Sequence, residues 1–339
     1  MLTLLSDILG QDAAIKWLAD AYQAERLPHA MIFAGPVGVG KATTARALAA
    51  LFLCQKPKGL VPCGKCESCR AFGAGSHPDY HVITKELIRY HDKTGKSKGI
   101  DLSIHVLRPE LIEPAGRKPS LGGGKVFVVE QAELMNVQAQ NALLKTLEEP
   151  AGRTLIVLLT DQLGALLPTI RSRCQTLRFS PLDPEKVRKE LERRGIDKSL
   201  AHDAAKLSRG SLGTALKWIG DGVIAPAREL AGQVDAAMAG RPPQDLPAWL
   251  KSASDAYAQK QLDRDELASK DQATREGLTL YLMIAGEHIR GQLAAQGDPT
   301  QLEGACGAID AIVRAERYLD ANVNTAVVLQ QLALALQRP

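Results

Sequence analysis

Short apolar runs alternate with helical patterns along the first half of the chain. The stretch Asn136–Glu149 has helical spacing, with Val137, Leu143, Leu144 and Leu147 expected on one face. Strands are predicted for five runs: Met31–Ala34, Tyr80–Thr84, Val126–Glu130, Leu155–Thr160 and Thr176–Phe179. Strands that alternate with helices are typical of a parallel sheet covered by helices, so the predicted class is α/β.

The second half lacks strand patterns. Pro181 and Pro184 mark a break, after which residues 182–221 indicate three short helices with glycine-containing turns. A further break near Gly220–Pro226 opens a long tail rich in Ala, Leu and Gln, which is typical of a helical bundle. We therefore predict three domains: 1–181, 182–221 and 222–339. In the tail, five apolar positions indicate a helix face that is buried or meets a partner: Val323, Val327, Val328, Leu332 and Leu336.

Composition and charge change this picture little. Hydrophobic residues make up 45% of the 339 residues and charged residues 24%, as in ordinary soluble globular proteins. The formal net charge of +4 does not argue for a dedicated nucleic-acid binder. The first residues do not resemble a signal peptide, and no apolar stretch reaches the roughly 18 residues that a membrane span needs. We expect a cytoplasmic protein whose thiols stay reduced.

A phosphate-binding loop is predicted from the letters GPVGVGKA, which begin at Gly35. Gly35, Gly38 and Gly40 lie between a predicted strand and a predicted helix. In that context the backbone N–H groups and the helix N-terminus face a phosphate, and Lys41 adds a positive charge. The alternative is a glycine-rich turn that binds no ligand, which the complete Gly-Lys spacing disfavours.

Two features that a nucleotide hydrolase of this kind needs are altered. The Ser or Thr whose hydroxyl holds magnesium is replaced by Ala42, and Thr43 is rotated from that position by about 100°. The strand KVFVV is followed by Glu130 and Gln131, where an Asp-Glu pair would bind magnesium and polarise water. Gln131 cannot take a proton, and loss of a general base typically costs roughly 10²–10⁴-fold in rate. We do not expect the chain to hydrolyse ATP alone, although the loop still allows ATP or ADP to bind.

Four of the six cysteines form a cluster. Cys54, Cys63, Cys66 and Cys69 follow the pattern C-x8-C-x2-C-x2-C, with Gly and Pro between them. Four thiolates at this spacing in a reducing compartment favour a tetrahedral structural zinc, with no position open for a catalytic water. The alternatives are disulfides, unrelated core cysteines and an iron–sulfur cluster.

Several motifs together resemble one family. They are ILGQ (8–11), LPHAMIFAGPVGVGK (27–41), the four-cysteine insert, NALLKTLEEP (141–150), LPTIRSRCQ (167–175) and AERYLDANVN (315–324). In this order they resemble bacterial clamp-loader subunits, AAA+ proteins that open the sliding clamp of the replicative DNA polymerase. The resemblance covers the whole chain. It implies an AAA+ P-loop domain with a zinc-binding insert, a small helical lid domain and an all-α collar domain that holds the subunits in a ring.

Within this family, gamma and tau are ATP-hydrolysing motors, whereas delta-prime is a rigid partner that typically does not hydrolyse ATP. A motor is expected to keep Ser or Thr at position 42 and Asp-Glu at 130 and 131. It is also expected to keep an ATP-contacting Arg in a Gly-Ser-x-Arg stretch, which in this chain ends in Gly213. Because all three features are altered, the resemblance favours the delta-prime type.

One functional residue of the family is retained. Arg173 in RSRC matches the arginine finger that enters the ATP site of the neighbouring subunit, although on its own it would be read as a surface or salt-bridging arginine. A finger supplied in this way can be worth roughly 10³–10⁵ in rate. Thr160, at the end of its predicted strand, matches the position that senses the nucleotide.

The function implied is that of a non-hydrolysing subunit of the clamp loader in the DNA polymerase III holoenzyme. The implied partners are the gamma/tau and delta subunits, with the sliding clamp and primed DNA reached through the complex, and no membrane. One rival interpretation is an active motor that tolerates Ala42 and Gln131. Another is a zinc-dependent nucleic-acid-binding protein, which the aromatic content of 4% disfavours because few rings are available for base stacking.

Overall fold

The chain forms two compact units in a computed structural model. The first combines Met1–Arg194 with Ser208–Thr214, and the second combines Gly195–Leu207 with Ala215–Pro339. The structure describes residues 2–91, 101–239, 241, 245–264, 269–293, 299–321 and 323–336. Among the helices in these ranges, none is both long and apolar enough to cross a membrane. The division into three domains stays a prediction.

The first unit is built on a parallel sheet of five strands in the order β2-β3-β4-β1-β5. Three of the strands are buried along their whole length, which is why their sequences are continuous apolar runs rather than alternating ones. All five predicted strands are confirmed, each to within one residue at either end. Their bounds are β1 (Ala30–Ala34), β2 (Tyr80–Ile83), β3 (Lys125–Val129), β4 (Thr154–Thr160) and β5 (Gln175–Arg178).

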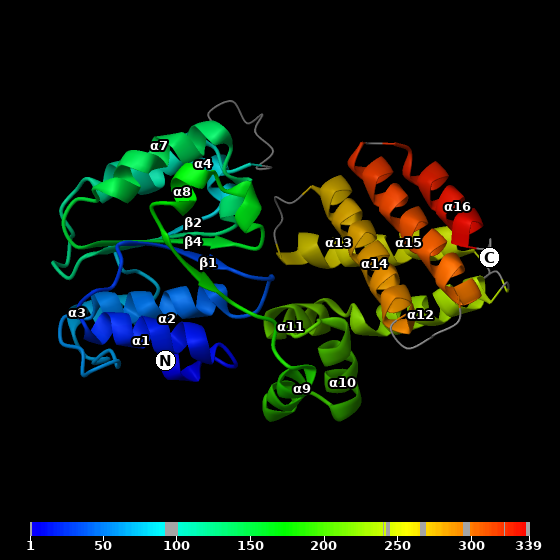
Figure 1. The fold of residues 1–339 in the computed structure, drawn as a ribbon, viewed down its shortest axis with the longest axis horizontal. Coiled ribbons are helices and arrows are strands. Elements are labelled where there is room, and N and C mark those ends of the chain that lie inside the picture. The colour runs from blue at the N-terminus through cyan, green and yellow to red at the C-terminus, as the bar shows by residue number, and fades with distance from the viewer. Residues whose placement is uncertain are drawn as a thin grey trace. The chain divides into compact units, whose positions relative to one another are not determined.

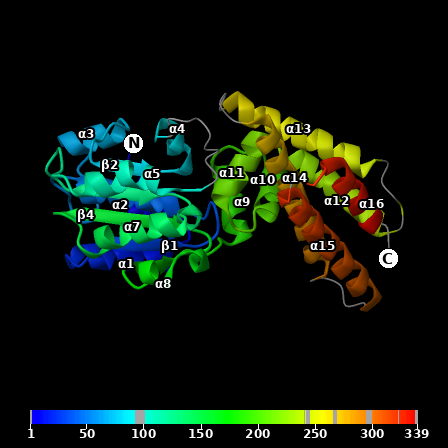
Figure 2. The same cartoon turned by 90° about the horizontal axis from the view of Figure 1, so that it is seen from above.

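Helices cover both faces of this sheet (Figures 1 and 2). The helices α1 (Asp12–Gln23) and α2 (Lys41–Leu53) pack on one face, and α7 (Val137–Glu148) packs on the other. Successive residues of β1 pack into the cores on opposite faces of the sheet. Phe33 belongs to the core on the α2 side and Ile32 to the core on the α7 side, because successive side chains of a strand point to opposite faces.

The face predicted for α7 was partly wrong. Leu143 and Leu147 are fully buried, but Val137 is 60% exposed. Six residues separate Val137 from Leu143, and they turn an α-helix by about 240°, so the two side chains point in different directions. The helix begins where Asn136 accepts a hydrogen bond from the N–H of Ala139 (2.9 Å).

Short helices connect these elements within the first unit. They are η1 (Leu5–Asp7), α3 (Glu67–Gly73), η2 (Lys85–Leu87), α4 (Ile88–His91), α5 (Ile104–Leu107), the π-helical turn η3 (Arg108–Ile112), α6 (Glu113–Ala115), η4 (Ala132–Leu134), η5 (Leu163–Ala165) and α8 (Pro168–Arg171). The three short helices expected over 182–221 are present as α9 (Pro184–Arg193), α10 (Lys198–Leu207) and α11 (Leu212–Asp221).

The tail of the second unit is helical, as expected. Its helices are α12 (Ile224–Met238), α13 (Leu246–Arg264), α14 (Lys270–Leu293), α15 (Pro299–Asp320) and α16 (Thr325–Leu336). The apolar positions predicted near α16 divide into two sets: Val328, Leu332 and Leu336 are buried, whereas Val323 and Val327 are 41% and 45% exposed. Asn322 of the AERYLDANVN motif lies outside the described residues.

Candidate functional site

The predicted phosphate loop runs from the carboxyl end of β1 into α2. Gly38 (φ 74°) and Gly40 (φ 106°) adopt backbone conformations that other residues rarely take, and these allow the chain to turn back into the helix. Gly35 donates its N–H to the carbonyl of Thr160 at the end of β4 (3.1 Å), which fixes the start of the loop. The strand, loop and helix therefore have the arrangement that the motif requires.

Lys41 bends back onto its own loop. Its Nζ donates to the carbonyl of Gly35 and to that of Pro36 (2.7 Å), and only 9% of the residue is exposed. Burial lowers the pKa of Lys41, while the carboxylates of Asp161 and Glu133 act in the opposite direction. The ammonium that would meet a phosphate is thus engaged by carbonyls of the loop itself.

The segment Ser208–Thr214 lies against this loop. Gly213 donates its N–H to the carbonyl of Gly38 (2.9 Å), and Ser211 Oγ donates to the carbonyl of Val37 (2.8 Å). A Cβ at position 213 would stand 2.9 Å from Gly38 Cα and 3.0 Å from Gly38 O, so any larger residue must shift the loop. Position 213 is where the resemblance expects an ATP-contacting arginine, and glycine there allows direct contact between the two backbones.

Gln11 holds the loop from another side and was not singled out from the sequence. It is 4% exposed, and its Nε2 donates to the carbonyls of Val39 (3.1 Å) and Ser180 (2.7 Å). Its Oε1 accepts the N–H of Ser180 (3.1 Å), so Gln11 joins the loop to the chain that follows β5. The available signal was its place as the last letter of the ILGQ motif.

Residue 42 offers no side-chain ligand for a magnesium ion. Ala42 is exposed in the first turn of α2 and offers no oxygen, and the buried hydroxyl of Thr44 donates to the carbonyl of Gly40 (2.8 Å). Gln131 has a left-handed backbone (φ 51°) where the chain turns into η4. Burial raises the pKa of Glu130, and the nearby carboxylate of Glu86 raises it further.

Two other carboxylates lie near the loop and were missed from the sequence. Glu133 and Asp161 are the groups whose charges act on Lys41, and burial raises the pKa of Glu133. Thr160, which is almost fully buried, accepts the N–H of Gln162 at its Oγ1 (3.1 Å). Asp161 follows Thr160 directly at the end of β4, so its place after a predicted strand was the available signal.

Arg173 contacts the ends of two helices rather than the phosphate loop. Its Nε and Nη2 both reach Glu148 Oε1 at 2.5 Å, and its Nη1 donates to the carbonyl of Thr169 in α8 (3.1 Å). Ile170 and Cys174, on either side of it in the chain, are buried in the core on the α7 side. The backbone at Arg173 is thus held in place by its buried neighbours, while the side chain remains 35% exposed.

The four cysteines of the predicted metal site are brought together. All four sulfur atoms lie within 4.8 Å of one another. The sulfurs of Cys63 and Cys69 are 3.9 Å apart, much longer than the about 2.05 Å of a disulfide bond. Backbone N–H groups point at three sulfurs: Cys63 N–H at Cys54 Sγ (3.2 Å), Cys66 N–H at Cys63 Sγ (3.4 Å) and Cys69 N–H at Cys66 Sγ (3.4 Å). Such donors stabilise thiolates, so this cluster fits a tetrahedral metal ion.

The cysteine cluster is attached to the end of α2 by a buried polar chain. Ser68 Oγ donates to the carbonyl of Leu53 (2.8 Å). His77 accepts the N–H of Asp79 at Nδ1 (3.1 Å), which leaves its Nε2 to donate to Ser68 Oγ (2.9 Å). Burial lowers the pKa of His77, which favours this neutral ring. The cluster is therefore tied to the helix that begins at the phosphate loop.

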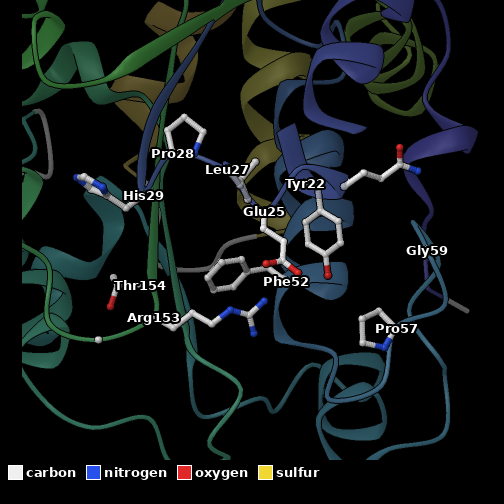
Figure 3. Close-up of a pocket in the computed structure, with 12 residues that line it drawn as sticks. Tyr22, Glu25, Leu27, Pro28, His29, Phe52, Pro57, Gly59, Arg153 and Thr154 are labelled. Atoms are coloured by element: carbon white, nitrogen blue, oxygen red, sulfur yellow. The ribbon is translucent and has the colours of Figure 1, made fainter. Parts of the chain in front are cut away.

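A cavity of about 740 Å³ lies at the opposite end of the strands from the loop (Figure 3). His29 and Thr154, which line it, stand at the amino ends of β1 and β4. Arg153 lies over the ring of Phe52 (4.2 Å to the centroid) and donates to the carbonyl of Gly123 (2.5 Å). No residue that the sequence singled out for chemistry lines this cavity.

The parallel sheet, the glycine-rich loop after β1 and the helices on both faces define the first unit as an α/β P-loop fold. Residues 10–183 match a family described as "DNA polymerase III, delta subunit". DNA polymerase III subunit delta′ of Pseudomonas aeruginosa is 43% identical over 146 residues, which are 43% of this chain and 41% of that protein. The subunit delta′ of Escherichia coli is 37% identical over 203 residues, 59% of this chain and 57% of that protein.

The chain belongs to the DNA polymerase III delta-prime subunit family. It spans about half the length of the curated relatives it matches. Among solved structures, a gamma subunit-related protein from Thermotoga maritima is 18% identical, with a TM-score of 0.42 over 94% of this chain and 98% of that one.

Proposed function

We propose that this chain is a non-hydrolysing, delta-prime-type subunit of a cytoplasmic clamp loader in the DNA polymerase III holoenzyme. It supports ATP-driven loading of the sliding clamp onto primed DNA and donates Arg173 to the ATP site of the neighbouring motor. Its direct partners are gamma/tau and delta subunits, and it reaches clamp and DNA through the assembled complex. In this proposal residues 182–221 are the lid and residues 222–339 contribute to the collar.

The observation that carries the proposal is that the phosphate loop and its lysine are engaged by contacts within the chain itself. Lys41 is held by Gly35 and Pro36, and Gly213 is held by Gly38. Phosphoryl transfer needs the lysine, the backbone N–H groups and a magnesium ion to be free to meet the nucleotide. ATP or ADP would therefore have to displace Lys41 before binding, and would then find no hydroxyl at position 42 and no base at position 131.

Arg173 is proposed as the arginine finger. It is partly exposed on a segment whose neighbours are buried, so it can reach out of the first unit from a fixed base. A guanidinium in such a position can stabilise the charge that develops on a neighbour's transferring phosphoryl group.

A zinc ion held by Cys54, Cys63, Cys66 and Cys69 is part of the proposal as a structural group. Four thiolate ligands fill a tetrahedral zinc, so the ion has no open position at which to activate water. Its role is to hold the loop between Cys54 and Cys69 in one conformation.

The test compares ATP hydrolysis by the isolated chain with hydrolysis by a complex of motor subunits, delta subunit, clamp and primed DNA. The isolated chain is expected to be inactive, and Arg173→Ala in the complex is expected to slow the adjacent motor by roughly 10³-fold or more. Arg171→Ala, which removes an exposed arginine two residues away, is the control and should leave the rate unchanged. Turnover by the isolated chain that is lost with Lys41→Ala would identify a motor instead. Salt-sensitive DNA binding by the isolated chain would favour a nucleic-acid-binding protein.

A further inference from the structure

Two glutamates end α7 at positions where acidic residues are unfavourable. Glu148 is the last helical residue and Glu149 follows it, so both carboxylates lie near the negative end of the helix dipole. Negative charge there destabilises a helix unless a cation compensates for it. Arg173 supplies that cation to Glu148, and the carboxylate of Glu149 is not among its partners.

The contacts of Arg173 fix the plane of its guanidinium from two sides. Nε and Nη2, which form one edge of the group, both reach Glu148 Oε1, and Nη1 donates to the carbonyl of Thr169. Nη2 carries two N–H groups, so its contact with Glu148 leaves one available to a further acceptor. The guanidinium can therefore keep Glu148 as a partner while it meets an incoming phosphate oxygen.

We propose that Glu148 is a positioning residue for Arg173, a role that rests on the proposed function of Arg173 as an arginine finger. Glu148 holds one edge of the guanidinium, so the side chain is already oriented when the neighbour's nucleotide arrives. A free arginine would lose rotamer entropy at that moment and would meet the phosphate in many orientations. An oriented donor stabilises the transition state without that reorganisation.

The experiment measures ATP hydrolysis by the complete complex with clamp and primed DNA. Glu148→Ala should lower kcat roughly fivefold, equivalent to about 1 kcal/mol, with KM for ATP unchanged. Glu148→Gln keeps an acceptor oxygen and should recover most of the rate. Glu149→Ala, which removes the adjacent exposed carboxylate, is the matched control and should match the wild type.

A double-mutant cycle separates positioning from a general structural effect. If Glu148 acts through Arg173, then Glu148→Ala adds no further loss when Arg173 is already alanine. Size-exclusion chromatography of each variant with its partners checks that the complex still assembles. A loss that persists in the Arg173→Ala background, or that accompanies failed assembly, would overturn the proposal.

Three further outcomes distinguish this inference from the proposed function on which it rests. If Arg173→Ala slows the motor but Glu148→Ala does not, Arg173 acts as an arginine finger but the positioning role of Glu148 is wrong. A faster motor with Glu148→Ala would also overturn it, because the ion pair would then restrain the finger. If Arg173→Ala leaves the rate unchanged, the proposed function of Arg173 is wrong and this inference falls with it.

Discussion

At the residue scale, Gly213 decides how closely two segments of the first unit approach. Its N–H contacts the carbonyl of Gly38, and the site has no room for a Cβ unless the loop moves. The resemblance leads us to expect arginine here in a motor subunit, and the spacing between Gly213 and Gly38 in this chain leaves no room for such a side chain. Glycine at position 213 thus allows the direct contact between these two backbones.

Gly213→Ala is expected to destabilise the first unit by about 1–3 kcal/mol, because its new Cβ must displace Gly38. Urea unfolding followed by circular dichroism measures this change. Gly164→Ala is the control within the same unit, since a Cβ at position 164 meets nothing within 4 Å. Its effect should stay within about 0.5 kcal/mol. Equal stability of the two variants would mean that the closing contact is not tight.

At the element scale, the segment between α2 and α3 contains the cysteine cluster and buries few apolar residues. The loop between α2 and α3 is mostly polar and exposed, and its contacts include the grouping of the four sulfurs and the backbone pairing of Lys58 with Val61. A metal ion that links such a loop acts like a cross-link, because it reduces the freedom of the unfolded chain. In the proposed function, a zinc ion on the four cysteines therefore helps to order a segment that buries few apolar residues.

Removal of the metal should destabilise the first unit by about 3 kcal/mol, which is the effect expected for cross-linking a loop of this length. The purified chain is expected to contain one zinc ion, measured by atomic emission. A chelator or Cys66→Ser should lower the melting temperature, whereas Cys306→Ser, at an exposed cysteine in α15, should not. A metal-free chain with unchanged melting would contradict the zinc assignment.

At the scale of the whole molecule, α16 presents apolar side chains on two faces. Leu332 and Leu336 are buried within the second unit, whereas Val327 and Leu334 are 45% and 61% exposed. Seven residues separate Val327 from Leu334, so both lie on one side of the helix. In the proposed function, this exposed side of α16 contacts a neighbouring subunit of the collar.

Val327→Asp is expected to weaken assembly with the motor and delta subunits by roughly tenfold or more, because it places a charge in an apolar contact. The stability of the isolated chain should change by no more than about 0.5 kcal/mol, since Val327 is exposed. Sedimentation of the mixed subunits measures assembly. Ala326→Asp is the control: it lies in the same turn but points about 100° away. Equal assembly by both variants would contradict a collar contact at this stripe.

Much of the fold and part of the site could be predicted from the sequence. Buried parallel strands must be continuous apolar runs, so the bounds of the five strands were predicted closely. The phosphate loop and the cysteine cluster depend on residues that are near one another in the chain, and their spacing indicated both. The changes at Ala42, Gln131 and Gly213 are likewise visible as single letters, because each replaces a residue type that the chemistry requires.

Only the tertiary structure decided the contacts between distant segments. The letters around Lys41 do not record that its ammonium contacts the carbonyls of Gly35 and Pro36. Gln11 reaches Ser180, and Glu148 reaches Arg173, across separations that no periodic pattern records. The exposure of Val137 and Val327 likewise depended on which side of each helix met a neighbour. Local spacing determines where an element forms, whereas the packing of elements against one another determines which side chains remain free to act.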